Sequence, residues 1–386
     1  HRDLHSFPTR RSSDLSEVVR GAKRVLLEVR IEKMAEQVYE TFEQGDPLGL
    51  PLDAVRQMML KGGVWPYLRQ RPYGTIANPS DTPKAIHVSC FDTAPLAPDF
   101  DYIVHGHGTE FQTGLNALSR LTGGKVHLNI RNTGGNSKVF LNSKGVEVNL
   151  FEGPHPSGNP GIQIHHVDPV NKGEVVWYLR PQEVMIIGRL FLEGRYNPTR
   201  IVALTGSGVK KPRYYKLLSG ACIDGLVHAQ AQEGDLRFIS GNVLTGSQIE
   251  HKGYLGFYDS QLTFIPEGKY HEFLGWSAPG ADKLSASGVF LSRLFPKKKF
   301  NPDTNMHGGE RAFVLSGQYE KVLPMDIYPV YLLKAILAQD IDKMEQLGIY
   351  EVEEEDFALC EFVCASKIEV QSIIRQGLDI MKKEMS

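Results

Sequence analysis

The sequence is poor in cysteine and contains no long hydrophobic run. It has four cysteines in 386 residues, Cys90, Cys222, Cys360 and Cys364, at irregular spacing. That pattern favours reduced thiols in a cytoplasmic setting over a disulfide framework. The most apolar stretches are short, such as Val184 to Ile187, whereas a helix that crosses a bilayer needs roughly 20 apolar residues. The residues therefore predict a chain that does not span a membrane.

The sequence also lacks an excess of charge of either sign. It carries 43 Lys and Arg against 45 Asp and Glu, a formal net charge of -2, and nucleic-acid binders usually show a concentrated basic footprint. The one basic run, Lys297 to Lys299, is short and typical of a solvated loop. With 41% hydrophobic and 23% charged residues, the composition predicts an ordinary globular protein of two or three domains. No nucleic-acid partner is expected.

Motifs for phosphate binding and hydrolysis are missing as well. The segment from His105 to Gly108 lacks the third glycine of a GxGxxG loop. Gly206 to Gly208 runs into two lysines and Pro212, where a helix that could receive a pyrophosphate does not easily begin. There is no GxSxG or HExxH motif, and the carboxylates are expected mostly in exposed helical runs. The sequence therefore predicts no catalytic residues, no bound nicotinamide cofactor and no metal.

What the sequence does contain is an unusual loop, FEGPHPSGNPGIQIHHVDP, from Phe151 to Pro169. Its prolines fix φ and its glycines permit backbone conformations that other residues avoid, so the loop is predicted to be rigid and pre-shaped. The continuation from Ile162 to Asp168 predicts a strand that carries polar groups back into the fold. Such loops often border a ligand surface. Hydrogen-bonded structural histidines are the alternative for His155, His165 and His166.

The first half of the chain reads as alternating strands and helices. Ala85 to Cys90 and Lys125 to Ile130 are predicted strands, and the apolar spacing between them predicts a helix from Tyr102 to Leu121. This βαβ pattern favours a parallel, doubly wound sheet. A further helix, Gln182 to Glu193, and a strand, Arg200 to Thr205, complete the predicted domain.

After Thr205 the pattern changes to short strands and turns. Strands are predicted within Val209 to Leu218, Arg237 to Leu244 and Tyr254 to Ile265, an arrangement typical of a small β-grasp module. Gly275 to Pro302 is a looser connector that is expected to wrap over a neighbouring surface.

The C-terminal part is predicted to be helical. One helix is expected from Ile327 towards Gly348, and the acidic residues 353–356 occupy positions that suit a helix N-terminus. Ser366 and Glu369 match a capping box. Behind it, one apolar face is formed by Val370, Ile373, Ile374, Leu378 and Met381.

Cys360 and Cys364 are expected to share a helical face. An iron–sulfur cubane needs four cysteines. These two cysteines are therefore predicted to be buried packing residues.

Several ordered blocks of this sequence resemble one family. They are GPHPSGNPGIQIHHVDPV, WPYLRQRP with the later Thr82-Pro83, GLNALSRLTG, GGERAFVLSGQYEKVLPMDIYP and EEEDFALCEFVCASK. Together they resemble the A subunit of the sodium-pumping NADH:quinone oxidoreductase, over nearly everything from Val18 to the end. The resemblance implies an α/β fold: a Rossmann-like domain, a β-grasp module of the soluble-ligand-binding type and a small C-terminal helical bundle.

The resemblance also implies domain boundaries. Residues 1–15, HRDLHSFPTRRSSDL, match nothing in that family, resemble a translated sequencing adapter and are excluded from the fold. Residues 16–40 are expected to be the remnant of an N-terminal barrel-sandwich hybrid module, so the chain looks truncated at its start. Its Val25, Leu27 and Val29 are then expected to form an exposed, aggregation-prone edge. The remaining boundaries are 41–205 for the Rossmann-like domain, 206–270 for the β-grasp module, 271–318 for the connector and 319–386 for the helical domain.

The function that the resemblance implies is that of a peripheral subunit on the cytoplasmic face of a respiratory complex. The complex passes electrons from NADH to ubiquinone and exports sodium, and partner subunits, especially integral membrane ones, carry the flavins and the iron–sulfur centre. A quinone needs an apolar slot with a hydrogen-bond donor at its carbonyl, which points to His155, Gly158 and His165. A purely structural scaffold is the alternative. A soluble electron-transport subunit related to the flavin- and NADH-binding subunit of complex I is a third interpretation.

Overall fold

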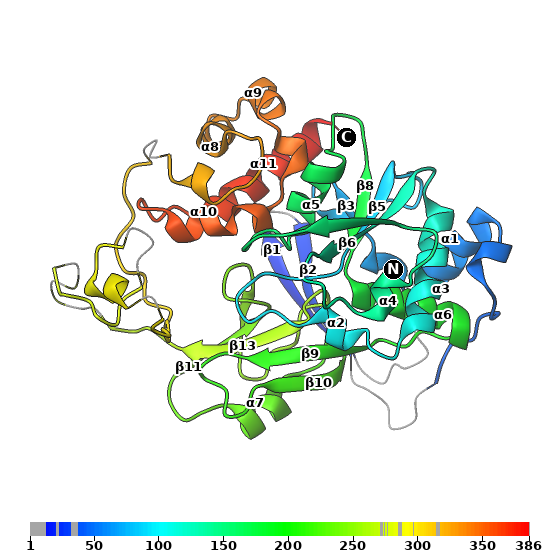
Figure 1. Ribbon diagram of the computed structural model, residues 1–386, viewed down its shortest axis with the longest axis horizontal. Coiled ribbons are helices and arrows are strands. Elements are labelled where there is room, and N and C mark those ends of the chain that lie inside the picture. Colours follow the sequence, from blue (N-terminus) through cyan, green and yellow to red (C-terminus); the bar gives the residue numbers. More distant parts are fainter. Residues whose placement is uncertain are drawn as a thin grey trace.

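The computed structural model describes residues 13–20, 23–31, 38–270, 273, 275, 277–284, 288–295, 297–313 and 317–385. The fold is mixed α/β, as predicted, with a six-stranded, a five-stranded and a two-stranded sheet. Figure 1 shows the C-terminal helices at the top, the five-stranded sheet at the bottom and the six-stranded sheet with its helices on the right. A segment that includes residues 288–295 projects from the body at the left of the view.

The six-stranded sheet has the order β4-β3-β8-β5-β6-β7. Its strands are β3 (Arg69–Arg71), β4 (Thr75–Ile76), β5 (Ala85–Ser89), β6 (Lys125–Arg131), β7 (Glu147–Phe151) and β8 (Val176–Leu179). Strands β8, β5, β6 and β7 run parallel, whereas β3 pairs antiparallel with β8 and β4. The strands predicted to begin at Ala85 and Lys125 are β5 and β6. Their predicted parallel pairing is confirmed, because the register runs from Ala85 opposite Lys125 to Ser89 opposite Asn129.

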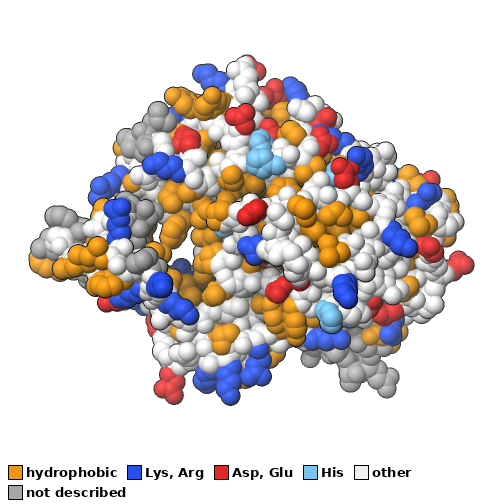
Figure 2. Space-filling view, viewed as in Figure 1, with side chains coloured by type: hydrophobic (Ala, Val, Ile, Leu, Met, Phe, Trp, Pro, Cys, Tyr) orange, Lys and Arg blue, Asp and Glu red, His pale blue; other side chains and the backbone are white. Residues whose placement is uncertain are grey.

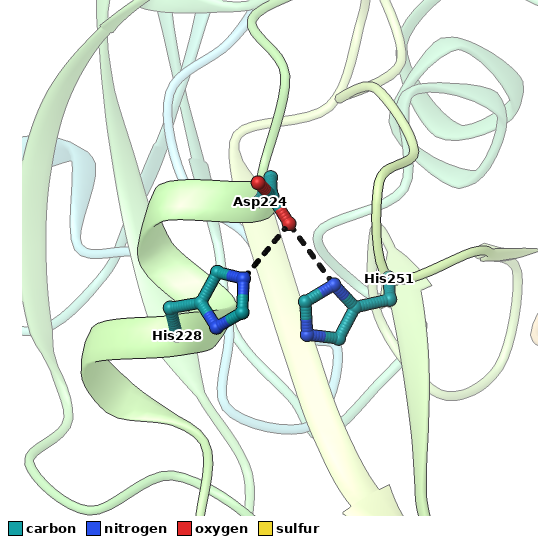
Figure 3. A group of neighbouring side chains, drawn as sticks. All are labelled: Asp224, His228 and His251. Atoms are coloured by element: carbon teal, nitrogen blue, oxygen red, sulfur yellow. Dashed lines mark ion pairs between the residues drawn. The ribbon is translucent and has the colours of Figure 1, made fainter.

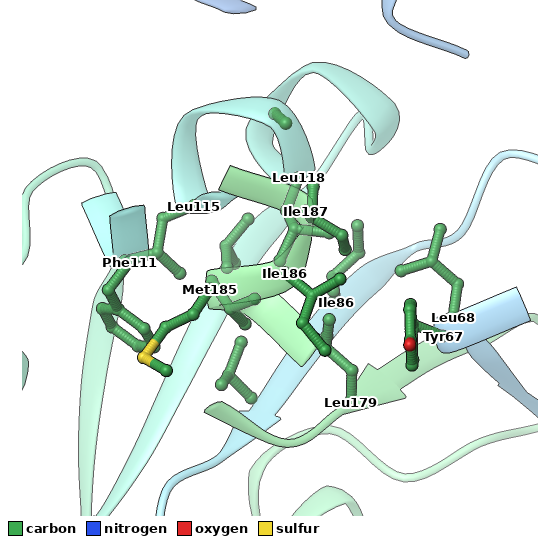
Figure 4. Packing of buried hydrophobic residues seen from close by; sticks show 14 of the residues in the cluster. Tyr67, Leu68, Ile86, Phe111, Leu115, Leu118, Leu179, Met185, Ile186 and Ile187 are labelled. Atoms are coloured by element: carbon green, nitrogen blue, oxygen red, sulfur yellow. The ribbon is translucent and has the colours of Figure 1, made fainter. Parts of the chain in front are cut away.

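The helices around this sheet are α1 (Leu52–Lys61), α2 (Phe100–Ile103), α3 (Gly108–Leu121), α4 (Lys138–Leu141), α5 (Pro160–Val167) and α6 (Pro181–Glu193), with 3-10 turns at Pro47–Gly49 and Trp65–Tyr67. Figure 4 shows α3 and α6 packed together, with their leucine and isoleucine side chains against Ile86 and Leu179 of the sheet. Two glycines allow this close approach. A Cβ on Gly114 would lie 2.1 Å from the backbone oxygen of Val184, and one on Gly188 would lie 1.8 Å from that of Glu110.

Two predicted elements of this region are corrected. The helix expected from Tyr102 to Leu121 is two helices, because Gly106 turns the chain with φ +81° between α2 and α3. The strand expected after the proline-rich loop is helix α5. Pro160 occupies its first position, where the fixed φ of proline favours a helix. The alternation of Ile162 and Ile164 was misleading, because all of the first five residues of the helix are buried and its apolar residues need not follow one stripe.

The five-stranded sheet has the order β10-β9-β13-β11-β12. Its elements are β9 (Thr199–Thr205), β10 (Arg213–Leu218), α7 (Asp224–Gln230), β11 (Leu236–Ser240), β12 (Ser247–Ile249) and β13 (Gln261–Pro266). Strand β9 was expected to close the first domain, but it pairs with β10 and β13 in this second sheet. The strand expected from Tyr254 begins only at Gln261, since the residues before it form turns.

The C-terminal part is helical, as predicted. It contains α8 (Pro329–Leu337), α9 (Ile341–Gln346), α10 (Ala358–Val363) and α11 (Val370–Glu384), with 3-10 turns at Leu291–Leu294, Tyr319–Lys321, Ile349–Glu351 and Glu354–Phe357. The single helix expected up to Gly348 is broken at Gln339, which adopts φ +55°. The predicted capping box is wrong, because Ser366 donates to the backbone oxygen of Ala312 and α11 begins after Glu369.

The packing predictions for this part are confirmed. The apolar face predicted for α11 is buried. Cys360 and Cys364 are also buried, as predicted, and the Tyr319 hydroxyl lies 2.9 Å from the Cys364 sulfur.

Near the start of the chain, β1 (Ser13–Arg20) and β2 (Lys23–Ile31) form an antiparallel pair. Leu15, at the end of the segment that the sequence analysis set apart, is the Cα partner of Val29. Val25 likewise has a strand partner, Val18. Residues 1–12 and the predicted exposure of the Val25, Leu27 and Val29 side chains lie outside what the structure describes. In the described parts of the chain, no helix has the length and hydrophobicity required to span a bilayer.

Candidate functional site

The proline-rich loop lies over the carboxyl end of the six-stranded sheet, where the strand order changes direction. Strands β6 and β7, which follow β5 in the sequence, lie on one side of β5, whereas β8 lies on the other side. Parallel α/β sheets bind their ligands at the carboxyl ends of the strands beside such a point. Ser89 ends β5 and Arg180 directly follows β8, so both lie at this edge.

Arg180 holds the proline-rich loop at the carboxyl end of the six-stranded sheet through hydrogen bonds. Its Nη1 donates to the backbone oxygens of Phe91 at 3.1 Å and Gly158 at 3.2 Å, and Ser89 Oγ donates to the same Gly158 oxygen at 3.1 Å. Gly158 must be a glycine here, because a Cβ would lie 2.7 Å from the backbone nitrogen of Thr93. The loop is therefore held against the sheet by backbone contacts that no other residue type permits.

His155 lies in this loop, and only one of its two ring nitrogens has a hydrogen-bond partner among the described residues. Its Nδ1 lies 3.0 Å from Thr93 Oγ1, and the same hydroxyl oxygen accepts from the Gly158 N–H at 3.0 Å. We assign the hydroxyl hydrogen to His155 Nδ1, which places the imidazole hydrogen on Nε2. Burial lowers the pKa of His155 and so favours the neutral ring. Nε2 is buried and finds no partner among the described residues, which leaves a free N–H donor at the sheet edge.

His165 and His166 lie elsewhere, on helix α5. His165 accepts from the Asp326 N–H through Nε2 at 3.0 Å, so its Nδ1–H donates to Glu351 Oε2 at 2.7 Å. His166 Nε2 donates to the backbone oxygen of Pro324 at 2.9 Å. Both ring nitrogens of His165 are thus used in joining α5 to the C-terminal helices. The structure brings His155 and Gly158 together through Thr93, and it places His165 in a different set of contacts.

Beneath α5, the sheet presents a buried polar layer that the sequence patterns did not predict. The rings of His87 and His127 stack at 4.6 Å, and Asn129 Nδ2 donates to Gln163 Oε1 of α5 at 3.1 Å. Burial, together with the charge of the neighbouring His127, lowers the pKa of His87 to about 3. The available signal was the alternation of apolar and polar residues in AIHVS and KVHLNIR, which indicates one apolar and one polar strand face.

A second missed feature is a buried ionic cluster, here named the Arg71 cluster, formed by Arg69, Arg71, Glu353, Glu355 and Asp356. The Arg71 side chain is fully buried, and its Nη1 donates to Asp356 Oδ2 at 2.9 Å while Nε lies 3.3 Å from Glu353 Oε1. Arg69 Nη2 lies 3.2 Å from Glu353 Oε2. The acidic residues do begin a helical turn, Glu354–Phe357, as predicted, but Glu353 and Asp356 are exceptions to the general expectation of exposed carboxylates, because each is 1% exposed.

Three carboxylates face two guanidinium groups in this cluster. Burial, together with the charges of Asp356 and Glu353, raises the pKa of Glu355 to about 7. The cluster joins strand β3 of the first sheet to the turn before α10, so its main role is to fix the helical part on the sheet.

Two surface cavities, of about 410 and 500 Å³, lie on the C-terminal helices, away from His155. The smaller is lined by residues of α8 and α9, including Tyr331, Lys334 and Leu347. The larger is lined mainly by polar and charged residues of α11, including Arg375 and Asp379. Neither cavity contains a residue predicted to bind quinone.

Comparison with known proteins places the chain in a family. The model of the "NqrA second alpha/beta domain" matches residues 50–196, and that of the "NQRA C-terminal domain" matches residues 201–251. The A subunit of the Na(+)-translocating NADH-quinone reductase of Rhodopirellula baltica is 39% identical over 380 residues, covering 97% of this chain and 83% of the relative. The corresponding Klebsiella pneumoniae protein, of the same name, is 41% identical over 382 residues, covering 98% and 85%.

Among solved structures, an NAD+-reducing [NiFe]-hydrogenase in its air-oxidized state matches with a TM-score of 0.44 and 12% identity, over 86% of this chain and 61% of the other. That likeness is too weak to carry an argument. The sequence relatives are sufficient, and they agree with the family indicated by the motif blocks. The chain belongs to the NqrA family, the A subunits of the Na(+)-translocating NADH-quinone reductases.

Proposed function

We propose that this chain is a peripheral subunit, on the cytoplasmic face of a membrane, of a complex that passes electrons from NADH to ubiquinone and exports sodium. The observation that carries the proposal is the identity of about 40% to subunits of that name over nearly the whole chain. Flavins, the iron–sulfur centre and the sodium path then belong to partner subunits, including integral membrane ones. On the strand orders, we assign the first sheet to a Rossmann-like domain and the second to a β-grasp module.

The projecting segment supports docking on partner subunits. It exposes large apolar side chains, with Val289 73%, Leu294 71% and Phe295 56% exposed. Figure 2 shows hydrophobic side chains on this segment at the left of the molecule. Exposed apolar surface of this kind marks interaction sites, and we propose that this segment lies against a neighbouring protein of the complex.

For the quinone step, we propose that His155 donates a hydrogen bond from Nε2 to a quinone carbonyl, at a loop whose shape depends on Gly158. The support is the unpaired, buried Nε2–H at the carboxyl edge of the sheet. Because Nε2 is closed off from solvent, the quinone reaches it only if the loop opens within the assembled complex. His165, with both nitrogens bonded, braces α5 against the helical part and acts through the position of the loop.

The test is affinity purification of a tagged chain with its complex from native membranes, followed by an assay of sodium-stimulated, NADH-dependent quinone reduction. His155→Ala should raise the KM for quinone roughly two- to tenfold, the value of one neutral hydrogen bond, with little change in kcat. His105→Ala is the matched control, because His105 is an exposed histidine outside the segment 151–169.

The outcomes separate the two functions weighed for this chain. An increased quinone KM in the His155 variant, with normal assembly, supports the quinone contact. An unchanged KM in a correctly assembled complex favours the scaffold function, in which partner subunits make every quinone contact. Recovery of the tagged chain alone, without membrane partners or activity, would overturn the assignment to the complex.

A further inference from the structure

The second domain brings two histidines and an aspartate together on its surface. Asp224 and His228 are one helical turn apart on α7, and His251 lies in the tight turn that follows β12. Figure 3 shows the two imidazole rings side by side, each with one nitrogen towards the same oxygen of the Asp224 carboxylate. His251 Nδ1 lies 3.0 Å and His228 Nε2 lies 3.4 Å from Asp224 Oδ1. One donor atom from each of the three residues lies within 4.8 Å of the other two.

These contacts are poorly explained as hydrogen bonds. Asp224 Oδ1 is shielded from solvent but receives no hydrogen bond among the described residues, although two imidazole nitrogens lie nearby. The two contacts are ion pairs only when the imidazoles are protonated. When the imidazoles are neutral, one oxygen and two nitrogens with this spacing have the arrangement that a cation requires.

We propose that Asp224, His228 and His251 bind a divalent transition-metal ion of the zinc class. Two imidazoles and one carboxylate suit zinc, nickel or copper, whereas calcium and magnesium prefer oxygen ligands throughout. Ligands about 2.0–2.1 Å from a tetrahedral zinc ion lie about 3.4 Å from one another, close to the two spacings measured here. A small rotation of the His228 and His251 side chains completes the set and leaves a fourth position for water.

The backbone around the three residues is already positioned for this site. The Ile223 N–H donates to the Gly253 oxygen at 3.0 Å, and the Leu255 N–H donates to the Ala221 oxygen at 2.9 Å. These bonds hold the start of α7 beside the turn that contains His251. A bound ion would therefore link α7 to the loop between β12 and β13 and stabilise this domain, independently of the function proposed above.

The test is a titration of the purified, chelator-stripped full chain with zinc chloride, followed by calorimetry and by metal analysis after dialysis. We expect one zinc ion per chain and a higher Tm with zinc. His251→Ala and Asp224→Asn should each weaken binding at least about tenfold. His105→Ala is the control for loss of a surface histidine.

Cys222 needs its own control, because it is exposed and close in sequence to Asp224. Cys222→Ser should keep full zinc binding. If zinc binding is lost in Cys222→Ser but retained in His251→Ala, the proposal is overturned. Absence of binding to the wild-type chain also overturns it.

Should a variant fail to fold, cobalt substitution of the wild-type chain gives an independent result. A tetrahedral cobalt spectrum without a thiolate charge-transfer band supports the site, and a thiolate band contradicts it.

Discussion

At the scale of single residues, the Arg71 cluster sets a pH dependence for folding. Glu355 has an ordinary pKa of 4.5 and a folded pKa of about 7. Between these two values the folded state keeps a proton that the unfolded state releases. The free energy of unfolding therefore falls as pH rises through this window, by at most about 3 kcal/mol for this group.

Glu355→Gln should remove this contribution. Denaturant unfolding measured from pH 4.5 to 7.5 is expected to show that the variant gains stability relative to wild type as pH rises. Glu354→Gln is the matched control for a carboxylate in the same segment, where Glu354 forms a more exposed pair with Arg375 at 3.2 Å. Parallel curves for wild type and Glu355→Gln would contradict the prediction.

The loop that contains His155 and Gly158 could be predicted from the sequence, because proline and glycine determine the backbone conformation of the segment in which they occur. The sequence could not reveal the Arg71 cluster, since Arg71 and Asp356 are 285 positions apart and each belongs to a segment that looks solvated when read alone. The same limit applies to His165. A histidine with both nitrogens bonded and one with a free nitrogen look identical in a sequence, and only the folded neighbours, Glu351 and Asp326, distinguish them.

At the scale of elements, the crossing of α3 and α6 depends on Gly114 and Gly188. Gly188→Ala should destabilise the protein by about 1–3 kcal/mol, the usual result of overpacking a core, because the new Cβ would meet the Glu110 backbone oxygen. Gly225→Ala in α7 is the control, since no heavy atom lies within 4 Å of its added Cβ. Thermal unfolding should show a lower Tm for the first variant alone. Equal Tm values would show that the helices can separate without cost.

The sequence predicted well those helices and strands whose type and ends are determined by residues within the element. Strands β5 and β6 and helix α6 have strong hydrophobic patterns and clear ends. Helix α5 was predicted as a strand, because a buried segment has no polar face from which to read a period. Strand β9 was assigned to the wrong sheet, because its apolar pattern fits either sheet and only pairing with β10 and β13 settles the choice.

At the scale of the whole molecule, Arg71 couples the helical part to the first sheet. Arg71→Ala should lower the free energy of unfolding by about 3–5 kcal/mol, since it leaves buried carboxylates without their counter-charge.

The loss of stability in this variant should be confined at first to the helical part of the chain. Because Arg71 also donates to the Glu351 backbone oxygen at 2.8 Å, both 3-10 turns before α10 lose their anchor, and hydrogen exchange should rise across residues 319–385. The five-stranded sheet, whose strands contain none of the cluster's residues, should keep its protection. Arg195→Ala serves as the control, because Arg195 forms a surface pair with Glu193. Uniform loss of protection in the Arg71 variant would mean that the helical part and both sheets unfold as one unit, and that the cluster stabilises the whole chain.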